Sequence, residues 1–207
     1  FNVTFTVTDS RGSSDPSPDV RLVTVQAAPP QVLPATGWSL VNANSEQPGF
    51  EGNLAFDGDT NSIWHTRYDP ADPMPHEILI NLGSTYDVSG LRYLPRQDYH
   101  NGRINTYEVY LSIDGINWGS PVASGAFANS YDEQEVLFTP TQAAYLRLVA
   151  LSTQDGDPIT AAAEISLLGQ PAVLNQAPDA TIDTPASNIV IDPGQTVNFT
   201  ATASDPE

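Results

Sequence analysis

Residues 53–66 read Asn-Leu-Ala-Phe-Asp-Gly-Asp-Thr-Asn-Ser-Ile-Trp-His-Thr, and the interpretation of the chain begins with this stretch. Hard cations such as calcium bind about six to eight oxygen ligands, which are carboxylates, hydroxyls and backbone carbonyls. Gly58 lets the backbone curl around a small ion. We therefore expect a structural calcium loop that sets the rim of a ligand-binding face. Its oxygen donors fall within six residues: Asp57, Asp59, Thr60, Asn61 and Ser62.

Two other interpretations fit part of this pattern. Asp57, Asp59 and Asn61 match the first three ligand positions of an EF-hand loop. The match then ends, because Ser62 stands where that loop needs Gly and Tyr68 stands where it needs a bidentate Glu. A plain Asp-Gly turn in a solvated acidic loop is the other alternative, and it stays open at this point.

Composition excludes several classes of function. The 207 residues carry a net charge of −18, and all seven basic residues are Arg. A chain this acidic lacks the clustered cations that nucleic acids and anionic membranes need, so we expect neither partner. Cys is absent, which excludes disulfides, thiol nucleophiles and Cys-based metal sites. No apolar run is long enough to cross a membrane, so membrane insertion is not expected.

Residues 35–170 predict the main domain, which is all-β. Short β patterns recur between turn signals, Asp114-Gly115 is a hairpin signal, and no long amphipathic helical pattern stands out. Many short strands with long polar loops predict a sandwich or jelly roll. The candidate strands are 38–43, 77–82, 88–94, 106–113, 133–139, 144–151 and 163–168.

The two ends differ in character from the middle. Residues 1–28 predict two strands, residues 29–34 are rich in Pro and predict a linker, and residues 171–207 predict further short strands. An irregular strand edge is the alternative for 29–34. Both ends resemble partial immunoglobulin-like domains of the polycystic-kidney-disease type. Either the middle is inserted in an array of such domains, or the two ends pack together.

Six motifs in the middle occur in one order and carry a family resemblance. They are the stretch 55–66, Leu-Pro-Arg-Gln-Asp at 94–98, Asn-Gly-Arg-Ile at 101–104, the segment 107–125, Tyr-Leu-Arg-Leu-Val-Ala at 145–150 and Ala-Glu-Ile at 163–165. Together they resemble the discoidin, or coagulation-factor type C, family. Within it they are similar to carbohydrate-binding module family 32 and to the N-terminal domains of galactose oxidases. The resemblance implies an eight-stranded jelly-roll sandwich, a buried calcium or sodium ion and binding of galactose-type sugars.

The resemblance assigns the calcium ligands residue by residue. They are backbone or side-chain oxygens of Leu54, Asp57, Asp59, Ser62, Ala163 and Glu164. An ion held between an early loop and the last strand would cross-link distant parts of the chain and so restrict the unfolded state.

The same family places the sugar-binding residues. It assigns hydrogen bonding to His65, Arg96 and Asn101, and it assigns stacking to Phe127, which looks exposed in a run of small and polar residues. Two alternatives stay open: His65 could cap the metal loop, and Arg96 could form a surface ion pair with Asp98. Trp64, which precedes His65, should lie in the core. Two further candidates are Tyr68 for stacking and Glu46 as a hydrogen-bond acceptor.

No nucleophile elbow, phosphate-binding loop or metal-spaced His pair is present in the sequence. The expected function is therefore non-catalytic, calcium-stabilised binding of a galactose-containing glycan within a larger secreted or cell-surface protein. Neighbouring immunoglobulin-like domains are the other expected partners. The alternative function is a structural or adhesive spacer in an extracellular array or filament.

Overall fold

The computed structural model describes residues 2–5, 19–22, 29–172, 179–184 and 200–204. Contacts divide the chain into two compact units, residues 1–30 and residues 31–207. The regular elements are strands, apart from one short 3₁₀ helix, η1 (Gly52–Phe56). Within the described ranges, a helix suited in length and hydropathy to crossing a bilayer is absent.

The terminal segments each contain one antiparallel pair of strands. β1 (Asn2–Phe5) pairs with β2 (Asp19–Leu22), and β12 (Asp179–Thr184) pairs with β13 (Thr200–Ser204). Of the further short strands predicted within 171–207, the one at 189–191 lies outside the described residues. The immunoglobulin-like character of the two ends stays a prediction.

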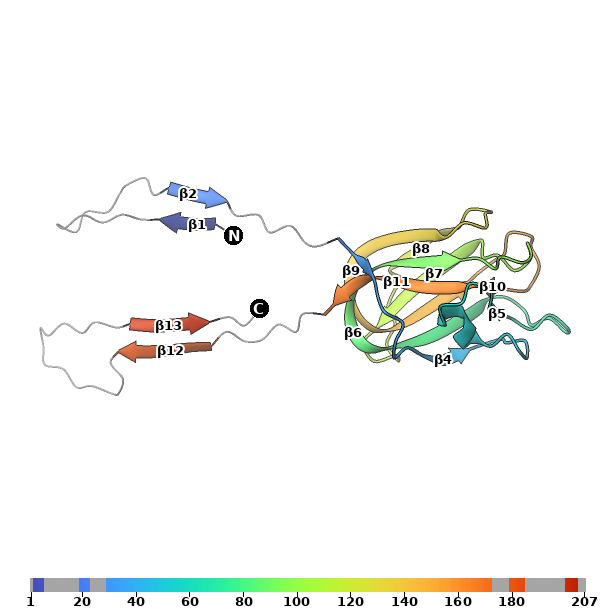
Figure 1. The fold of residues 1–207 in the computed structure, drawn as a ribbon, viewed down its shortest axis with the longest axis horizontal. Helices are drawn as coiled ribbons and strands as arrows, with labels where there is room; N and C mark the ends of the chain where they lie inside the picture. Colours follow the sequence, from blue (N-terminus) through green and yellow to red (C-terminus); the bar gives the residue numbers. More distant parts are fainter. Residues whose placement is uncertain (1, 6–18, 23–28, 173–178, 185–199, 205–207) are drawn as a thin grey trace, which may run out of the picture. The chain divides into compact units, whose positions relative to one another are not determined.

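The central domain is one curled antiparallel sheet of seven strands (Figure 1). The first half of β6 (His76–Leu94) pairs with the second half of β9 (Gln134–Ala150), while the second half of β6 pairs with the first half of β9. Bulges between these halves let both strands bend, so each runs through two layers. The predicted all-β sandwich is confirmed, and the candidate strands 77–82 and 88–94 are one continuous strand, as are 133–139 and 144–151.

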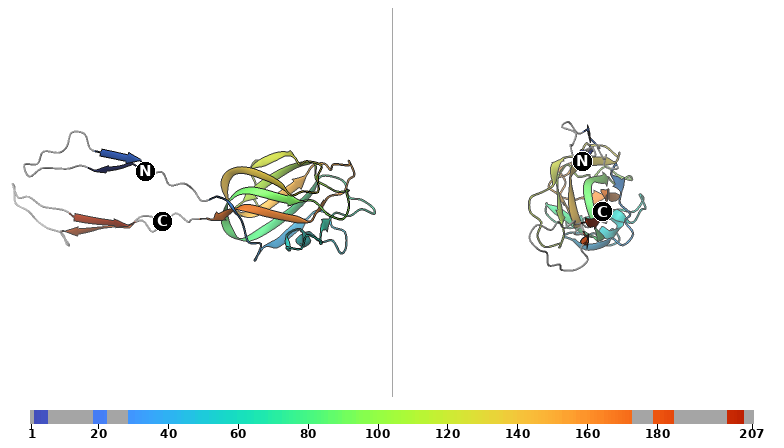
Figure 2. Two further views of the ribbon diagram at one scale, coloured as in Figure 1. Left: turned by 45° about the horizontal axis from the view of Figure 1, so that its top comes forward. Right: turned by 90° about the vertical axis from the view of Figure 1, so that its left-hand side faces the viewer.

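The remaining strands complete the two layers. On the side of the first half of β6 lie β4 (Ser39–Ala43), β7 (Thr106–Ser112) and β8 (Ala123–Ala126). On the other side lie β11 (Glu164–Pro171) and β3 (Gln31–Val32). Figure 2 shows these strands curling around a common interior.

Part of the expected linker 29–34 belongs to this sheet. β3 pairs with β11 through Val32 and Leu168, and the next residue, Leu33, is buried in the core. The alternative of a strand edge therefore describes 31–33 better than a linker does. The reason is that Leu33 gains apolar burial only against a strand more than a hundred residues away.

Alternating apolar residues build the core. Along β6, Ile78, Ile80 and Leu82 are fully buried, whereas the residues between them are partly exposed. Full burial of such a side chain contributes about 1.5–3 kcal/mol. Trp64 is 1% exposed, as expected of a core residue, and its indole N–H donates to the Ser45 carbonyl at 3.1 Å.

A two-stranded ribbon links the core to the loops at one end of the domain. β5 (Trp64–His65) pairs with β10 (Ala161–Ala162), so that His65 lies opposite Ala161. β5 follows the acidic loop at 57–62, and β10 immediately precedes Ala163 and Glu164. The ribbon therefore brings the predicted metal ligands and the predicted sugar-binding histidine into one region.

Candidate functional site

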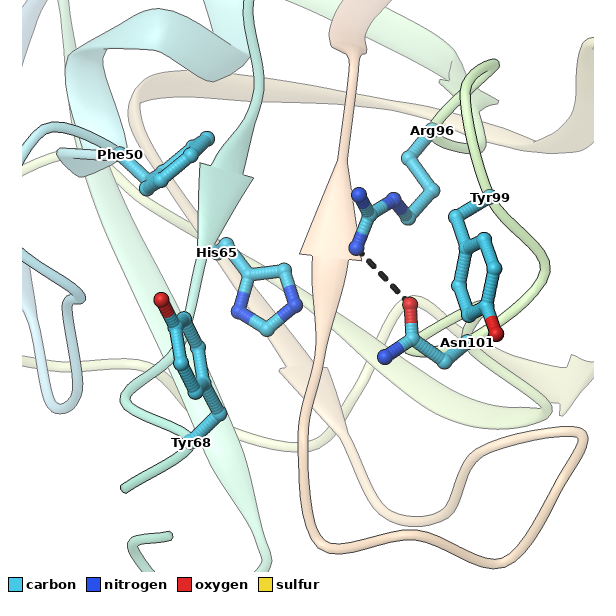
Figure 3. A pocket seen from close by; sticks show the side chains of 6 residues that line it. All are labelled: Phe50, His65, Tyr68, Arg96, Tyr99 and Asn101. Carbon is cyan, nitrogen blue, oxygen red and sulfur yellow. Dashed lines mark hydrogen bonds between the residues drawn. The ribbon is translucent and has the colours of Figure 1, made fainter. Parts of the chain in front are cut away.

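A pocket of about 350 Å³ lies where three loop regions meet (Figure 3). Four of the six predicted sugar-binding residues line it, namely His65, Tyr68, Arg96 and Asn101. The structure adds two aromatic residues that sequence reasoning did not identify, Phe50 and Tyr99. A signal for both existed in the sequence, because each is a large aromatic residue within a polar loop that flanks a predicted site residue.

His65 provides a hydrogen-bond acceptor to the pocket. Its ring is 4% exposed, and Nδ1 lies 2.5 Å from the Thr66 carbonyl oxygen. A carbonyl oxygen only accepts, so in the neutral ring Nδ1 carries the proton and Nε2 keeps its lone pair. Burial lowers the pKa of His65 below its ordinary value, and the nearby charge of Arg96 acts in the same direction. The neutral ring is therefore the form at physiological pH.

Arg96 presents donors to the same pocket. Its side chain is 11% exposed, and it makes two hydrogen bonds to Asp98, at 2.8 and 2.7 Å, and one to Asn101 Oδ1, at 2.8 Å. A guanidinium group has five N–H donors, so two remain for a ligand. The ion pair with Asp98 that the sequence allowed does exist, and it orients a largely buried pocket residue. Its hydrogen bonds lower the pKa of Asp98.

Asn101 is oriented by the same interaction. Because its Oδ1 accepts from Arg96, its amide nitrogen is turned to be the free donor of this side chain. Figure 3 shows His65, Arg96 and Asn101 pointing toward a shared space. One acceptor from β5 and several donors from the loop after β6 therefore converge.

Aromatic rings enclose the polar groups. Phe50 and Tyr68 contact the His65 ring edge-to-face, with ring centroids 6.2 and 5.5 Å away respectively. On the opposite side Tyr99 lies beneath the Arg96 guanidinium, at 5.9 Å from its ring centroid. All three rings are substantially exposed, and Tyr68 is 53% exposed. Exposed rings beside hydrogen-bonding groups suit a ligand with one apolar and one polar face.

The other two predicted sugar-binding residues lie elsewhere. Phe127 is only 6% exposed and stacks on Tyr107, with ring centroids 4.0 Å apart. The expectation of an exposed ring at Phe127 is therefore wrong, because the end of β8 turns this side chain into the core. Glu46 does not line the pocket either, and its carboxylate accepts the Gly52 N–H at 2.6 Å.

The acidic loop gathers oxygen atoms around the Ser62 hydroxyl. Ser62 Oγ lies 2.9 and 2.8 Å from the two carboxylate oxygens of Asp57, 2.8 Å from the Asp59 carbonyl and 3.4 Å from the Leu54 carbonyl. One hydroxyl proton cannot satisfy four acceptors. The cluster therefore has more lone pairs than protons, which is the chemistry of a hard-cation site.

The last strand closes this loop. Glu164 Oε1 accepts the Gly58 N–H at 2.8 Å, although the two residues are 106 positions apart. Burial and the charges of Asp57 and Asp59 raise the pKa of Glu164 to about 7. Ala163 is buried between β10 and β11, and its N–H donates to the Leu94 carbonyl. Leu54, Asp57, Asp59, Ser62, Ala163 and Glu164 thus lie in one region.

The carboxylate of Asp59 makes its hydrogen bonds within the acidic loop. Its Oδ1 accepts from the backbone and side-chain amides of Asn61, at 2.9 and 2.8 Å. Within the described ranges, three or more His, Cys, Asp or Glu side chains do not cluster closely enough to share an ion. The expected ligand set does not require that, because it uses the carboxylates of Asp57 and Glu164 together with carbonyl and hydroxyl oxygens.

Sequence comparison identifies relatives that share this domain. Galactose oxidase of Gibberella zeae is 40% identical over 163 residues, which are 76% of this chain and 24% of that protein. Sialidase of Micromonospora viridifaciens is 40% identical over 137 residues, which are 64% of this chain and 21% of that protein. The chain therefore spans about a quarter of the length of these curated relatives.

Solved structures show the same fold. CpGH89CBM32-5 from Clostridium perfringens, in complex with GalNAc-β-1,3-galactose, is 35% identical with a TM-score of 0.62, covering 66% of this chain and 99% of that one. The family 32 module of Clostridium perfringens NanJ, in complex with galactose, is 26% identical with a TM-score of 0.61, covering 67% and 98% respectively. The profile of the F5/8 type C domain matches residues 41–165, which is more than half of the chain. The chain thus belongs to the F5/8 type C, or discoidin, domain family.

Proposed function

We propose that the chain is a non-catalytic, calcium-stabilised carbohydrate-binding module that recognises galactose-type sugars within a larger secreted or cell-surface protein. The observation that carries this proposal is the convergence of His65, Arg96 and Asn101 between exposed aromatic rings. Relatives of the same fold form complexes with galactose and with GalNAc-β-1,3-galactose. Their length also supports a larger parent protein, since the matched segment is only 24% of one curated relative and 21% of the other.

The donors and acceptors of the pocket complement a hexose. Neighbouring sugar hydroxyls can each donate and accept one hydrogen bond. Arg96 has two free N–H donors in a fixed plane, which suits two adjacent hydroxyl oxygens, while His65 Nε2 accepts from a hydroxyl. The aromatic rings of Phe50, Tyr68 and Tyr99 offer apolar surfaces for the C–H face of the sugar.

Calcium is the second part of this proposal. Oxygens of Leu54, Asp57, Asp59 and Ser62 from the loop, and of Ala163 and Glu164 from the last strand, would hold it. The surplus of acceptors around Ser62 fits a cation rather than a network of protein hydrogen bonds alone. The ion would supply positive charge that neutralises Asp57 and Glu164 and fixes the loop that leads into His65.

The non-catalytic part rests on the lining of the pocket. Glycoside hydrolysis ordinarily uses two carboxyl groups placed on either side of the scissile bond. The six residues that line the pocket include no Asp or Glu. The Asp98 carboxylate is committed to Arg96 through two hydrogen bonds. The chemistry of these residues is that of binding.

Galactose titration of an Arg96→Ala variant tests the proposal. Loss of its charge-assisted donors should weaken galactose binding by about tenfold or more in isothermal titration calorimetry. Arg92→Ala is the matched control, because Arg92 is an ion-paired arginine on β6 that does not line the pocket. The control should bind galactose as the unmodified protein does. A flat titration of the unmodified protein with galactose and N-acetylgalactosamine would contradict the proposal and favour the spacer function.

A further inference from the structure

A second pocket, of about 290 Å³, has no role in the binding described so far. Its volume is close to that of the first pocket. Two of its residues come from the acidic loop, one from the approach to β5 and two from the segment after β6. They are Thr60, Asn61, Ile63, Gln97 and Asp98.

The two pockets are neighbours. Arg96 lines the first and Asp98 lines the second, and their side chains are joined by hydrogen bonds of 2.8 and 2.7 Å. Consecutive rings in a glycan are linked through a single oxygen atom. A sugar attached to one that occupies the first pocket must therefore lie against the immediate surroundings of that pocket, which include this ion pair.

The side-chain amides of Gln97 and Asn61 in the second pocket are held by hydrogen bonds from their nitrogen atoms, which leaves their oxygen atoms available to a ligand. Gln97 Nε2 donates to two backbone carbonyls, at 2.7 and 2.9 Å, so Oε1 is the group available to a ligand. Asn61 Nδ2 donates to Asp59 Oδ1 at 2.8 Å, so its own Oδ1 is available in the same way. Both side chains are therefore held as hydrogen-bond acceptors.

The remaining lining residues add further hydrogen-bond acceptors. Asp98 accepts only, and its side chain is 67% exposed despite the bond to Arg96. Thr60 adds a hydroxyl, and Ile63 adds apolar surface. The pocket thus offers acceptors and one negative charge, and its lining includes no cationic side chain. Such a surface suits a group that donates hydrogen bonds and carries no negative charge.

We propose that the second pocket is a subsite for the neutral sugar linked to the galactose-type residue in the first pocket. The inference rests on the proposed function, because it requires the first pocket to hold a sugar. It adds that the ligand is at least a disaccharide and that its second unit is neither sulfated nor a uronic or sialic acid. Sugar hydroxyls donate to Asp98, Gln97 and Asn61, whereas an acidic sugar is repelled by Asp98.

Calorimetric titration of the full chain in calcium with methyl β-galactoside and three disaccharides tests this inference. The disaccharides are lactose, N-acetyllactosamine and Gal-β-1,3-GalNAc. At least one should bind about fivefold or more tightly than methyl β-galactoside, which is the effect of one or two added hydrogen bonds. Adding a 6-sulfate to the GlcNAc of N-acetyllactosamine should remove any gain that this disaccharide shows.

A blocking variant separates this subsite from the first pocket. Gln97→Trp places a bulky ring in the second pocket, because Gln97 is exposed and lines that pocket alone, and it should abolish the preference for the disaccharide while methyl β-galactoside binds as before. Ser120→Trp is the matched control, because Ser120 is exposed and lines neither pocket. Equal affinity for all neutral ligands, or an unchanged preference in Gln97→Trp, overturns the inference and leaves the proposed function intact. No binding of methyl β-galactoside overturns both.

Discussion

Arg96 and His65 are complementary because each is oriented by a different neighbour. Asp98 and Asn101 hold the guanidinium, and the Thr66 carbonyl holds the imidazole in the tautomer that leaves Nε2 free. Neither side chain therefore has to lose much rotamer freedom when a sugar binds, which lowers the entropic cost of association. The pocket is arranged in advance as donors on one side and an acceptor on the other.

This arrangement predicts a pH dependence of sugar binding. Burial lowers the pKa of His65 in the folded protein, so the ring is neutral above the ordinary value of about 6.5 and affinity is constant there. As pH falls through the lowered pKa, Nε2 gains a proton, can no longer accept, and adds charge beside Arg96. Calorimetric affinity for galactose in saturating calcium should therefore fall as the pH is lowered from 7.5 through the lowered pKa of His65.

One result would contradict this pH dependence, and one variant serves as its control. A galactose affinity that stays constant while NMR shows His65 taking up its proton would show that Nε2 does not accept from the sugar. A His65→Gln variant, whose side chain does not titrate, should bind more weakly and show little change over the same pH range.

The acidic loop and the β5–β10 ribbon form the element on which the site depends. The loop ends three residues before His65. Glu164, which is 106 positions away from Gly58 in the sequence, accepts the Gly58 N–H. Closing a long segment of chain in this way restricts the unfolded state. Without a cation, the loop brings the carboxylates of Asp57 and Glu164 together, as the raised pKa of Glu164 indicates.

Calcium removal should accordingly destabilise the domain. A ligand that binds the folded state alone stabilises it by about 4 kcal/mol when present at a thousand times its dissociation constant. Adding a chelator should therefore lower the melting temperature measured by calorimetry, and adding calcium back should restore it. Asp57→Asn should lose most of this response, whereas Asp155→Asn, in an exposed loop, should keep it. A melting temperature that does not respond to chelator or calcium would contradict a structural ion.

The sheet of the central domain includes one strand, β3, that lies outside the domain boundaries 35–170 expected from the sequence. β3 adds to the sheet beside β11, and Leu33 is buried in the core that the two layers share. The core residues identified in the structure all fall between Leu33 and Leu168. Residues 29–172 therefore contain the complete curled sheet.

Two fragments should differ in stability for this reason. In the full chain, the unfolding transition of the central domain is the one whose temperature rises when galactose is added. The fragment 29–172 should have the same melting temperature as that transition. Residues 35–170 lack β3 and Leu33, and burial of that one side chain contributes about 1.5–3 kcal/mol. Chemical denaturation should therefore find the shorter fragment less stable by at least this amount. Equal stability of the two fragments would show that β3 is dispensable.

The local sequence was enough to predict the β architecture, the acidic loop and the central pair of His65 and Arg96. Alternating apolar residues and a dense run of oxygen donors are local patterns, and the family motifs carry the rest. Only the tertiary structure decided which aromatic rings line the pocket. Phe127 stands in a polar run yet packs between Tyr93 and Tyr107, while Phe50 and Tyr99 stay exposed at the pocket. The physical reason is that the burial of a ring depends on partners from distant strands, which neighbouring residues in the sequence do not specify.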